Sequence, residues 1–249
     1  MGAFHIGYFG KLPARGDFVK GAAQQELTGL IDKWLIGMMT QLTINPRWKQ
    51  HYDALQPLHF AFVGPGSHVA VAGHLAASHD QSGRRFPFAA MGTLAVPQPG
   101  SFLAASPLAL EPLWQRLGAL AGEVLAAGDP AAPLQALGRA VLETDTAGER
   151  HVAALDRFAA ATNVATLEAM LAHGGRRPSV RGIMLGIGLL LQPFDWRGNT
   201  QLERSLALPL PCEAAQRPAV AAFWLALVAP FLHHKDIELA LFAARIAER

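Results

Sequence analysis

The chain has 249 residues, of which 51% are hydrophobic and only 16% charged, and its formal net charge is +2. This composition excludes an intrinsically disordered chain, and the scattered charges disfavour nucleic-acid binding because they form no basic tail or stripe. The single cysteine, Cys212, excludes an internal disulfide and a cysteine-based zinc cluster, which fits a reducing compartment, and we expect it to be packed rather than reactive.

The first residues, MGAFHIGYFGK, lack the basic region, apolar region and cleavage site of a signal peptide. The sequence therefore predicts a cytoplasmic protein. Two long uncharged stretches, 54–79 and 86–110, are interrupted by proline or glycine, and 218–232 is short, whereas a spanning helix needs roughly 20 continuous apolar residues. We expect no membrane insertion.

The first predicted elements are a buried strand over 4–9 and an amphipathic helix that begins after Asp17. Asp17 stands where a helix N-cap would accept backbone N–H groups, and apolar residues recur at helical spacing from Ala23 to Leu42. Asn45 followed by proline repeats this start signal and predicts a second, shorter helix.

Two strand-like runs, 58–63 and 68–75, flank a Gly-Pro-Gly turn and predict a β-hairpin. The run 86–96 is apolar and predicts a central strand that is buried on both faces. The polar stretch 78–85 is therefore expected to be a loop between strands.

The middle of the chain predicts three helices, over 107–127, 134–144 and 151–173. The apolar run 180–191 fits either a strand or a buried helix, and its three glycines favour a strand or a tightly packed element. The five tryptophans are expected in the core, with interface anchoring as the alternative.

The last predicted elements are a strand over 205–210, a helix over 218–231 and a strand over 237–242 that closes the sheet. Strands interleaved with helices indicate the α/β class with helices on both faces of the sheet. We predict a three-layer αβα sandwich, with a mixed central sheet and a helix-rich middle segment, in one domain spanning 1–249.

No catalytic pattern stands out in the sequence. Gly10-Lys11 lacks the other residues of a phosphate loop, and no GxSxG nucleophile elbow occurs. His233-His234 are adjacent, and His68 and His74 share a predicted strand without a carboxylate partner pattern. We therefore predict no metal, no cofactor and no enzymatic activity.

Two charged loops remain in an otherwise apolar chain. One follows the first strand and the other precedes the central strand. If they meet at one end of the sheet, Asp17 would pair with an arginine of the second loop and fix the corner. Equally, loops on a rigid sheet often carry recognition. The charged residues are Lys11, Arg15 and Asp17 in the first loop, and Asp80, Arg84 and Arg85 in the second.

An enzyme or small-molecule site is the alternative from a different functional class. Lys11, Arg15, Arg84 and Arg85 would then line a phosphate site at the start of the helix that follows Asp17. Asp17 counts against this alternative, because its carboxylate would already occupy the position that favours an anion.

Two motifs resemble the TagF family of type VI secretion-associated proteins. They are GYFGKLP over 7–13 with GDF over 16–18, and SGRRFP over 82–87; the segment 218–227 is similar more loosely. The resemblance implies a three-layer αβα fold and a cytoplasmic protein that holds the secretion apparatus off after translation. It also implies binding to the system's forkhead-associated scaffold protein, beside a threonine kinase and phosphatase pathway.

The resemblance carries over no catalytic residue. It supplies positions that are characteristic of the family, in the two charged loops. We take as candidate binding residues Lys11, Pro13, Arg15, Asp17, Arg84 and Arg85.

Overall fold

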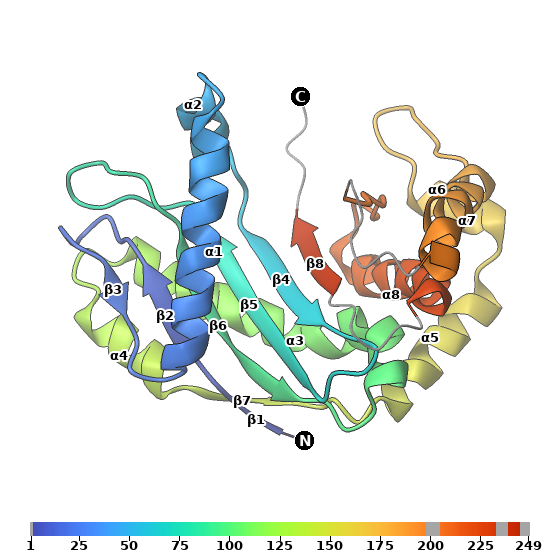
Figure 1. Cartoon of the computed structure of the whole chain (residues 1–249), viewed down its shortest axis with the longest axis horizontal. Coiled ribbons are helices and arrows are strands. Elements are labelled where there is room, and N and C mark those ends of the chain that lie inside the picture. Colours follow the sequence, from blue (N-terminus) through green and yellow to red (C-terminus); the bar gives the residue numbers. More distant parts are fainter. Residues whose placement is uncertain (1, 198–204, 233–238, 245–249) are drawn as a thin grey trace.

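A computed structural model of the chain describes residues 2–197, 205–232 and 239–244 (Figure 1). The predicted histidine pair His233-His234 and the side chain of Trp196 lie outside the described residues.

One six-stranded sheet organises the molecule, in the order β3-β2-β6-β5-β4-β8. The α/β class is confirmed, but every pairing in this sheet is antiparallel, so the expectation of a mixed sheet was wrong. Short connections join β4, β5 and β6, and such connections favour antiparallel neighbours. The strands are β2 (Gly7–Gly10), β3 (Val19–Lys20), β4 (Leu58–Val63), β5 (Val69–Ala76), β6 (Phe88–Ala95) and β8 (Leu239–Ala244).

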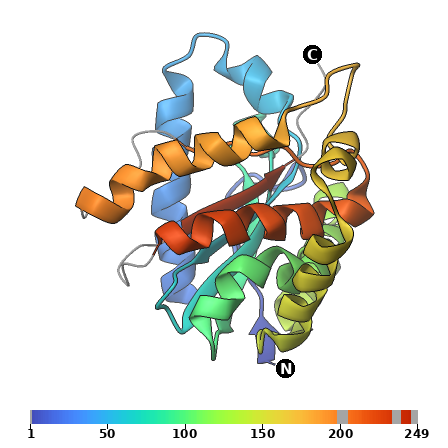
Figure 2. The ribbon, with the colours of Figure 1, turned by 90° about the vertical axis from the view of Figure 1, so that its right-hand side faces the viewer.

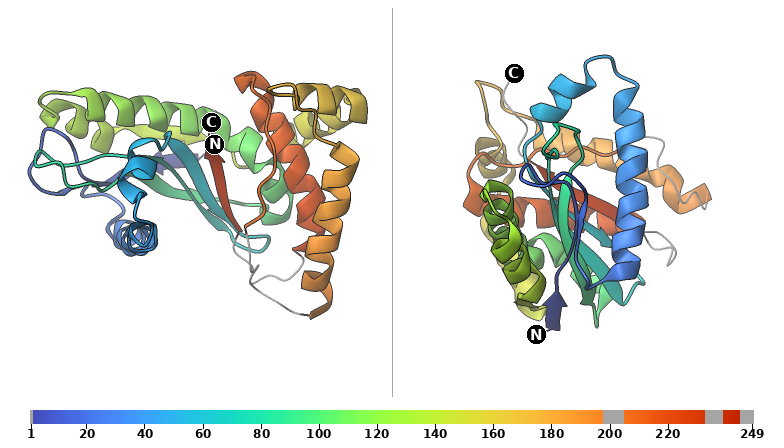
Figure 3. Two further views of the ribbon diagram at one scale, coloured as in Figure 1. Left: turned by 90° about the horizontal axis from the view of Figure 1, so that it is seen from above. Right: turned by 90° about the vertical axis from the view of Figure 1, so that its left-hand side faces the viewer.

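Helices cover both faces of this sheet, as Figure 3 shows. α1 (Gln25–Thr43) lies on one face, over a core that includes Phe60 and Met91. α3 (Pro99–Ala126) lies on the other face, where Leu117 belongs to a larger core. The three-layer αβα arrangement is confirmed, and so are the β4–β5 hairpin and the central position of β6.

The predicted strand 4–9 divides into two strands. β1 (Gly2–His5) leaves the main sheet and pairs with β7 (Val141–Thr144), while β2 continues into the main sheet. Gly92 explains the crossing of β1 over β6, because a Cβ there would lie 2.4 Å from the His5 carbonyl oxygen. The helix predicted over 134–144 therefore ends early, and its last residues pair as β7.

Several helix starts differ from the prediction. α1 begins at Gln25, after a left-handed Gln24, because Val19–Lys20 pair with β2 as strand β3. The Asp17 carboxylate accepts from the adjacent Phe18 N–H at 2.7 Å instead of capping a helix. α3 begins at Pro99 rather than Pro107, which is buried inside the helix. The helix predicted over 151–173 breaks at Asn163, whose side chain caps a new helix at Thr166 N.

The described part also contains shorter helices, and the run 180–191 is helical although its glycines had favoured a strand. Cβ atoms at Gly186 and Gly188 would meet nothing within 4 Å, so these glycines mark open helix surface, not tight packing. The helices are α2 (Trp48–Asp53), α4 (Ala131–Arg139), α5 (Glu149–Ala161), α6 (Val164–Met170), α7 (Val180–Arg197) and α8 (Arg217–Val228), with 3-10 turns over Ala214–Gln216 and Ala229–Phe231.

α7 and α8 lie side by side at the end of the molecule that is on the right in Figure 1 and that faces the viewer in Figure 2. α8 also contacts α3. The strand predicted over 205–210 is not paired in a sheet; it packs on α8 instead, where Trp224 Nε1 donates to the Pro209 carbonyl at 2.9 Å. Among the described residues, the helical segment 214–231 is long and apolar enough to cross a bilayer, but core helices pass the same test, and 28% of this one is buried.

Two histidines lie between the sheet and α3. His59 on β4 and His74 on β5 are cross-strand partners, with their Nδ1 atoms 3.1 Å apart, and the His59 ring stacks on Trp114. His68 instead lies 3.1 Å from the Val96 carbonyl, so the two histidines predicted to share a strand are not paired. Burial lowers the pKa of His59 and of His74 from 6.5 to about 4, and the neighbouring His74 adds to this effect on His59.

This pair predicts a loss of stability in mild acid. Between pH 6.5 and about 4 the unfolded chain binds protons that the folded pair does not, so the free energy of unfolding falls as the pH falls. We expect urea titrations to show a decrease of about 4 kcal/mol from pH 6.5 to 4.5, about 2 kcal/mol from each ring. The variant His59→Gln/His74→Gln should lose most of this slope, with a remainder from His151, whose pKa burial also lowers. An equal slope in the variant would contradict the assignment.

Candidate functional site

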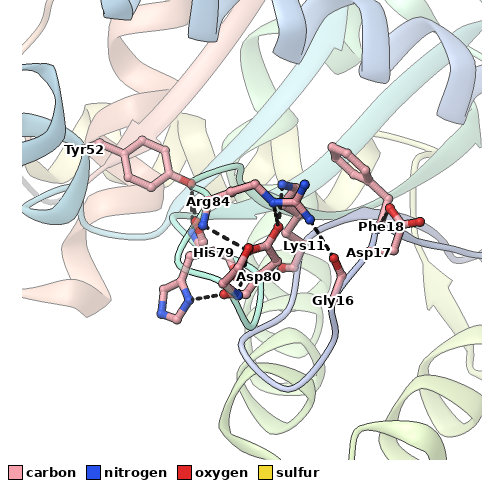
Figure 4. A network of polar contacts seen from close by, with 10 residues as sticks. Lys11, Gly16, Asp17, Phe18, Tyr52, His79, Asp80 and Arg84 are labelled. Atoms are coloured by element: carbon pink, nitrogen blue, oxygen red, sulfur yellow. Dashed lines mark hydrogen bonds and ion pairs between the residues drawn. The ribbon is translucent and has the colours of Figure 1, made fainter.

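The two charged loops meet at one end of the sheet, as predicted (Figure 4). The Gln81 N–H donates to the Arg15 carbonyl at 2.9 Å, and Arg84 Nη2 donates to the Gly16 carbonyl at 2.8 Å. One backbone–backbone bond and one bond from a side chain to the backbone thereby join two loops that are far apart in the sequence.

Asp80 lies at the centre of this junction and is completely buried. One carboxylate oxygen accepts from Lys11 Nζ at 2.7 Å and from Arg84 Nε at 2.6 Å. The other accepts from the backbone N–H of Ser82 at 3.0 Å, from the Ser82 hydroxyl at 2.8 Å and from the Arg84 N–H at 2.9 Å. We call Asp80 and these three partners the Asp80 network.

Burial by itself would raise the pKa of Asp80, but the bonds from Lys11, Ser82 and Arg84 together hold it well below its ordinary value. Asp80 is therefore ionised throughout the neutral range. Each donor offsets part of the cost of removing the charge of Asp80 from water. The buried carboxylate therefore holds its donors, and with them the two loops, in place.

Backbone geometry at two glycines makes this junction possible. Gly83 has φ +78° in the turn around Asp80, a conformation that favours glycine. Gly10 has φ +143°, and a Cβ there would lie 2.2 Å from the Pro87 carbonyl oxygen. The close approach of the loops depends on the missing side chain of Gly10, whereas Gly83 contributes only its positive φ, because a Cβ there would meet nothing within 4 Å.

The network extends to α2 through Ser78 and Tyr52. The Ser78 hydroxyl donates to the Lys11 carbonyl at 2.7 Å, and the Tyr52 hydroxyl donates to the Ser78 carbonyl at 2.8 Å. The Ser78 N–H returns a bond to the Tyr52 hydroxyl at 2.9 Å. Burial is the main cause that raises the pKa of Tyr52 to about 12, so the hydroxyl remains a donor at neutral pH.

Arg85 ties the second loop to α2 by a separate bond. Its Nε and Nη2 donate to the two carboxylate oxygens of Asp53 at 2.8 and 2.7 Å, a bidentate pair that is partly open to solvent. The hydrogen bonds from Arg85 are the main cause that lowers the pKa of Asp53.

Aromatic rings close the other side of the Asp80 network. Phe18 stacks on Phe9 at 5.2 Å between ring centroids and meets the Phe86 ring edge-on at 4.9 Å. Lys11 Nζ lies 5.0 Å from the Phe18 ring centroid, which is a cation–π distance.

The predicted site residues take different roles in the structure. Pro13, Arg15, Asp17 and Arg84 are exposed, Arg85 is partly exposed, and Lys11 is buried. The expected pairing of Asp17 with Arg84 or Arg85 was wrong, because the Asp17 carboxylate accepts from the Phe18 N–H. Arg84 donates to Asp80 instead, and Arg85 donates to Asp53. Asp80 accepts from the backbone N–H groups two and four residues after it, and this local turn geometry favours Asp80 as the acceptor.

Sequence reasoning missed Tyr52, Asp53 and Ser78 as members of the site. Tyr52 and Asp53 come from α2, which no spacing rule connects to the loops, whereas Ser78 is the first residue of the polar stretch 78–85. Composition did not single out Asp53, which is one of 19 acidic residues.

The cations of the loops are all engaged by carboxylates. Lys11 and Arg84 bind Asp80, Arg85 binds Asp53, and Arg15 Nη2 lies 3.4 Å from Asp129 at the surface. The first loop leads into the short strand β3 and the second into β6, so neither leads directly into a helix. The geometry therefore offers a phosphate no unpaired cation among these four.

In the described part of the chain, no group of three or more His, Cys, Asp or Glu residues could hold a metal ion. Cys212 is exposed, not packed as expected, with Sγ 3.0 Å from His173 Nδ1. The neighbouring Pro211 takes the buried position instead.

Comparison with known proteins supplies a family. The model of the TagF N-terminal domain, Type VI secretion system-associated, matches residues 7–143. PA0076 from Pseudomonas aeruginosa PAO1 is a similar solved structure, at 24% identity and a TM-score of 0.46, over 56% of this chain and 64% of that one. The chain thus spans under two thirds of that protein. No match is found among curated proteins.

Removing Lys11 should destabilise the fold far more than removing an exposed cation. Lys11→Met leaves the buried Asp80 with one donor fewer, and we expect the thermal midpoint to fall by about 10 °C. Arg15→Met, which breaks only the exposed pair with Asp129, should change the midpoint by less than about 2 °C.

A double-mutant cycle isolates the interaction. Asp80→Asn removes the charge but keeps the shape, so Lys11→Met/Asp80→Asn should cost clearly less than the sum of the single changes. Strict additivity, measured by thermal melting of all four proteins, would show that Lys11 and Asp80 do not stabilise each other.

Proposed function

The chain belongs to the TagF family of type VI secretion system-associated proteins, and we propose that it is a cytoplasmic negative regulator of such a system that acts after translation. It binds and sequesters the system's forkhead-associated scaffold protein, and the machine then fails to assemble. Its repression is linked to a threonine kinase and phosphatase pathway, whose enzymes are other chains.

The family match over residues 7–143 carries the secretion context of this proposal. The site geometry supports binding over bond-making. Every charged side chain of the Asp80 network is satisfied by another residue of this chain, so the network fixes a surface and holds no group poised to act as acid, base or nucleophile.

The phosphate-site alternative receives no support from this arrangement. Binding an anion between Lys11 and Arg84 would require displacing Asp80, whose buried carboxylate already has five donor contacts around it. An unpaired Asp80 would then remain in the interior at high cost. We therefore propose a protein-binding module as the function.

Association with the scaffold protein tests this proposal. The purified chain should bind the purified forkhead-associated protein of the same secretion system in calorimetry, and the two should co-purify from cells. Deletion of the gene should raise secretion without raising the levels of the secretion proteins, because repression acts after translation.

The decisive comparison combines both measurements. Derepressed secretion in the deletion strain, together with no detectable association of the two purified proteins, would refute sequestration while keeping the protein a regulator. Altered levels of the secretion proteins would refute action after translation.

A further inference from the structure

An apolar groove lies beside the Asp80 network, between the C-terminal half of α1, α2 and the adjoining ends of β4 and β5. Its volume is about 700 Å³, and its walls include Trp34, Met38, Leu42, Leu55 and Leu58. This volume is in the range of sites that accept several side chains of a ligand or peptide.

The groove leaves large apolar side chains open to water. Leu55 is 50% exposed and Met38 is 38% exposed. Phe242 on the edge strand β8 is 52% exposed and stacks on Trp34, with ring centroids 6.0 Å apart, so the apolar surface continues from the groove toward β8. A connected apolar surface of this kind marks a site of association.

Basic residues stand at the groove. Lys33 is the charged residue among those that line it, and no carboxylate lines it. Arg47 and Lys49 do not line it but are exposed in the stretch between the lining residues Leu42 and Tyr52, and we call these three cations the basic rim. Within the part of the chain that the structure describes, none of these three forms an ion pair. The carboxylate of α2, Asp53, is already held by Arg85.

We propose that this groove is the docking site for an acidic, amphipathic segment of the scaffold protein. The segment inserts apolar side chains between α1 and α2 and places carboxylates against Lys33, Arg47 and Lys49. This is the pattern by which apolar grooves take amphipathic helices, and the flexible Met38 and Met39 suit a surface that adjusts to its ligand. The identity of the partner rests on the function proposed above.

A second copy of this chain fits the groove less well. A two-fold symmetric dimer would bring the same patch against itself, and the basic rim of one copy would face the basic rim of the other. Like charges facing each other across an interface oppose association. Charge complementarity therefore favours an acidic partner.

The Asp80 network supports one wall of the groove. Tyr52 lines the groove and is anchored through its hydroxyl to Ser78, and Pro87 at the end of the second loop also lines it. The Arg85–Asp53 pair fixes the same helix. The family-characteristic loops thus act on the binding surface through α2, as positioning residues and not as direct contacts.

Variants of the groove test the proposal against matched controls on the same scaffold. Met38→Glu and Leu55→Glu place a charge in the groove and should each weaken binding of the purified forkhead-associated protein about tenfold or more. Ile36→Glu is the control, because Ile36 is 52% exposed on the same helix and does not line the groove. It should bind within about twofold of the unchanged chain.

Charge reversal tests the rim. Lys33→Glu/Lys49→Glu should weaken binding and reduce its dependence on salt, because attraction between exposed charges is screened. Arg116→Glu/Arg157→Glu, an equal charge change at exposed positions of α3 and α5 away from the groove, should leave both unchanged. Benzoylphenylalanine at position 55 should crosslink to an acidic segment of the scaffold, whereas the same group at position 36 should not.

The outcomes separate this inference from the proposed function. If the unchanged chain binds the scaffold and the groove and rim variants bind equally well, the groove is not the docking site, although the sequestering function stands. If the unchanged chain does not bind the scaffold, both the sequestering function and the docking site are refuted. A dimer that Met38→Glu dissociates, or binding to anionic lipid vesicles that Leu55→Glu abolishes, would overturn the proposal in favour of a second copy or a membrane.

Discussion

One buried carboxylate, that of Asp80, joins the two charged loops of the candidate site. Asp80 accepts from Lys11, which follows the first strand of the main sheet, and from Arg84, which precedes its central strand. The ion is removed from water completely, so it is tolerated only while these donors stay in place. The two loops are therefore held together, and this holds the residues around them in fixed positions.

The bonds of the two loops also fix the position of α2. Ser78 joins the Lys11 backbone to Tyr52, and Arg85 joins the same loop to Asp53, so α2 is attached at two adjacent residues. α2 forms a wall of the apolar groove. The Asp80 network, whose residues do not line the groove, can thus control the position of one of its walls, which is how we connect the family motifs to the proposed partner.

The sequence predicted this architecture where the pattern was local and repeated. The apolar run before Val96 indicated the central strand, and helical spacing indicated α1 and α3, because burial on a sheet or under a helix imposes those periods. It failed where tertiary contacts decided the outcome. β7 exists because β1 lies beside it, and residues 205–210 stay outside the sheet because α8 covers them.

The candidate site was predicted in part for the same reason. Proximity of the two loops followed from their positions at strand ends, but the choice of partner for each charge depended on distances that no spacing reveals. Asp17 was expected to pair with an arginine and instead faces its own backbone, while Asp80 and Asp53 accept the arginines. The contribution of α2 became visible only in three dimensions.

Hydrogen exchange of the Lys11→Met variant tests most directly whether the Asp80 network holds the groove in place. The account predicts that amides of residues 48–56 and 78–86 lose protection together, while amides in the centres of β5 and β6 keep theirs. Unchanged protection of residues 48–56, with protection lost only in 78–86, would contradict it, because α2 would then be held by other contacts.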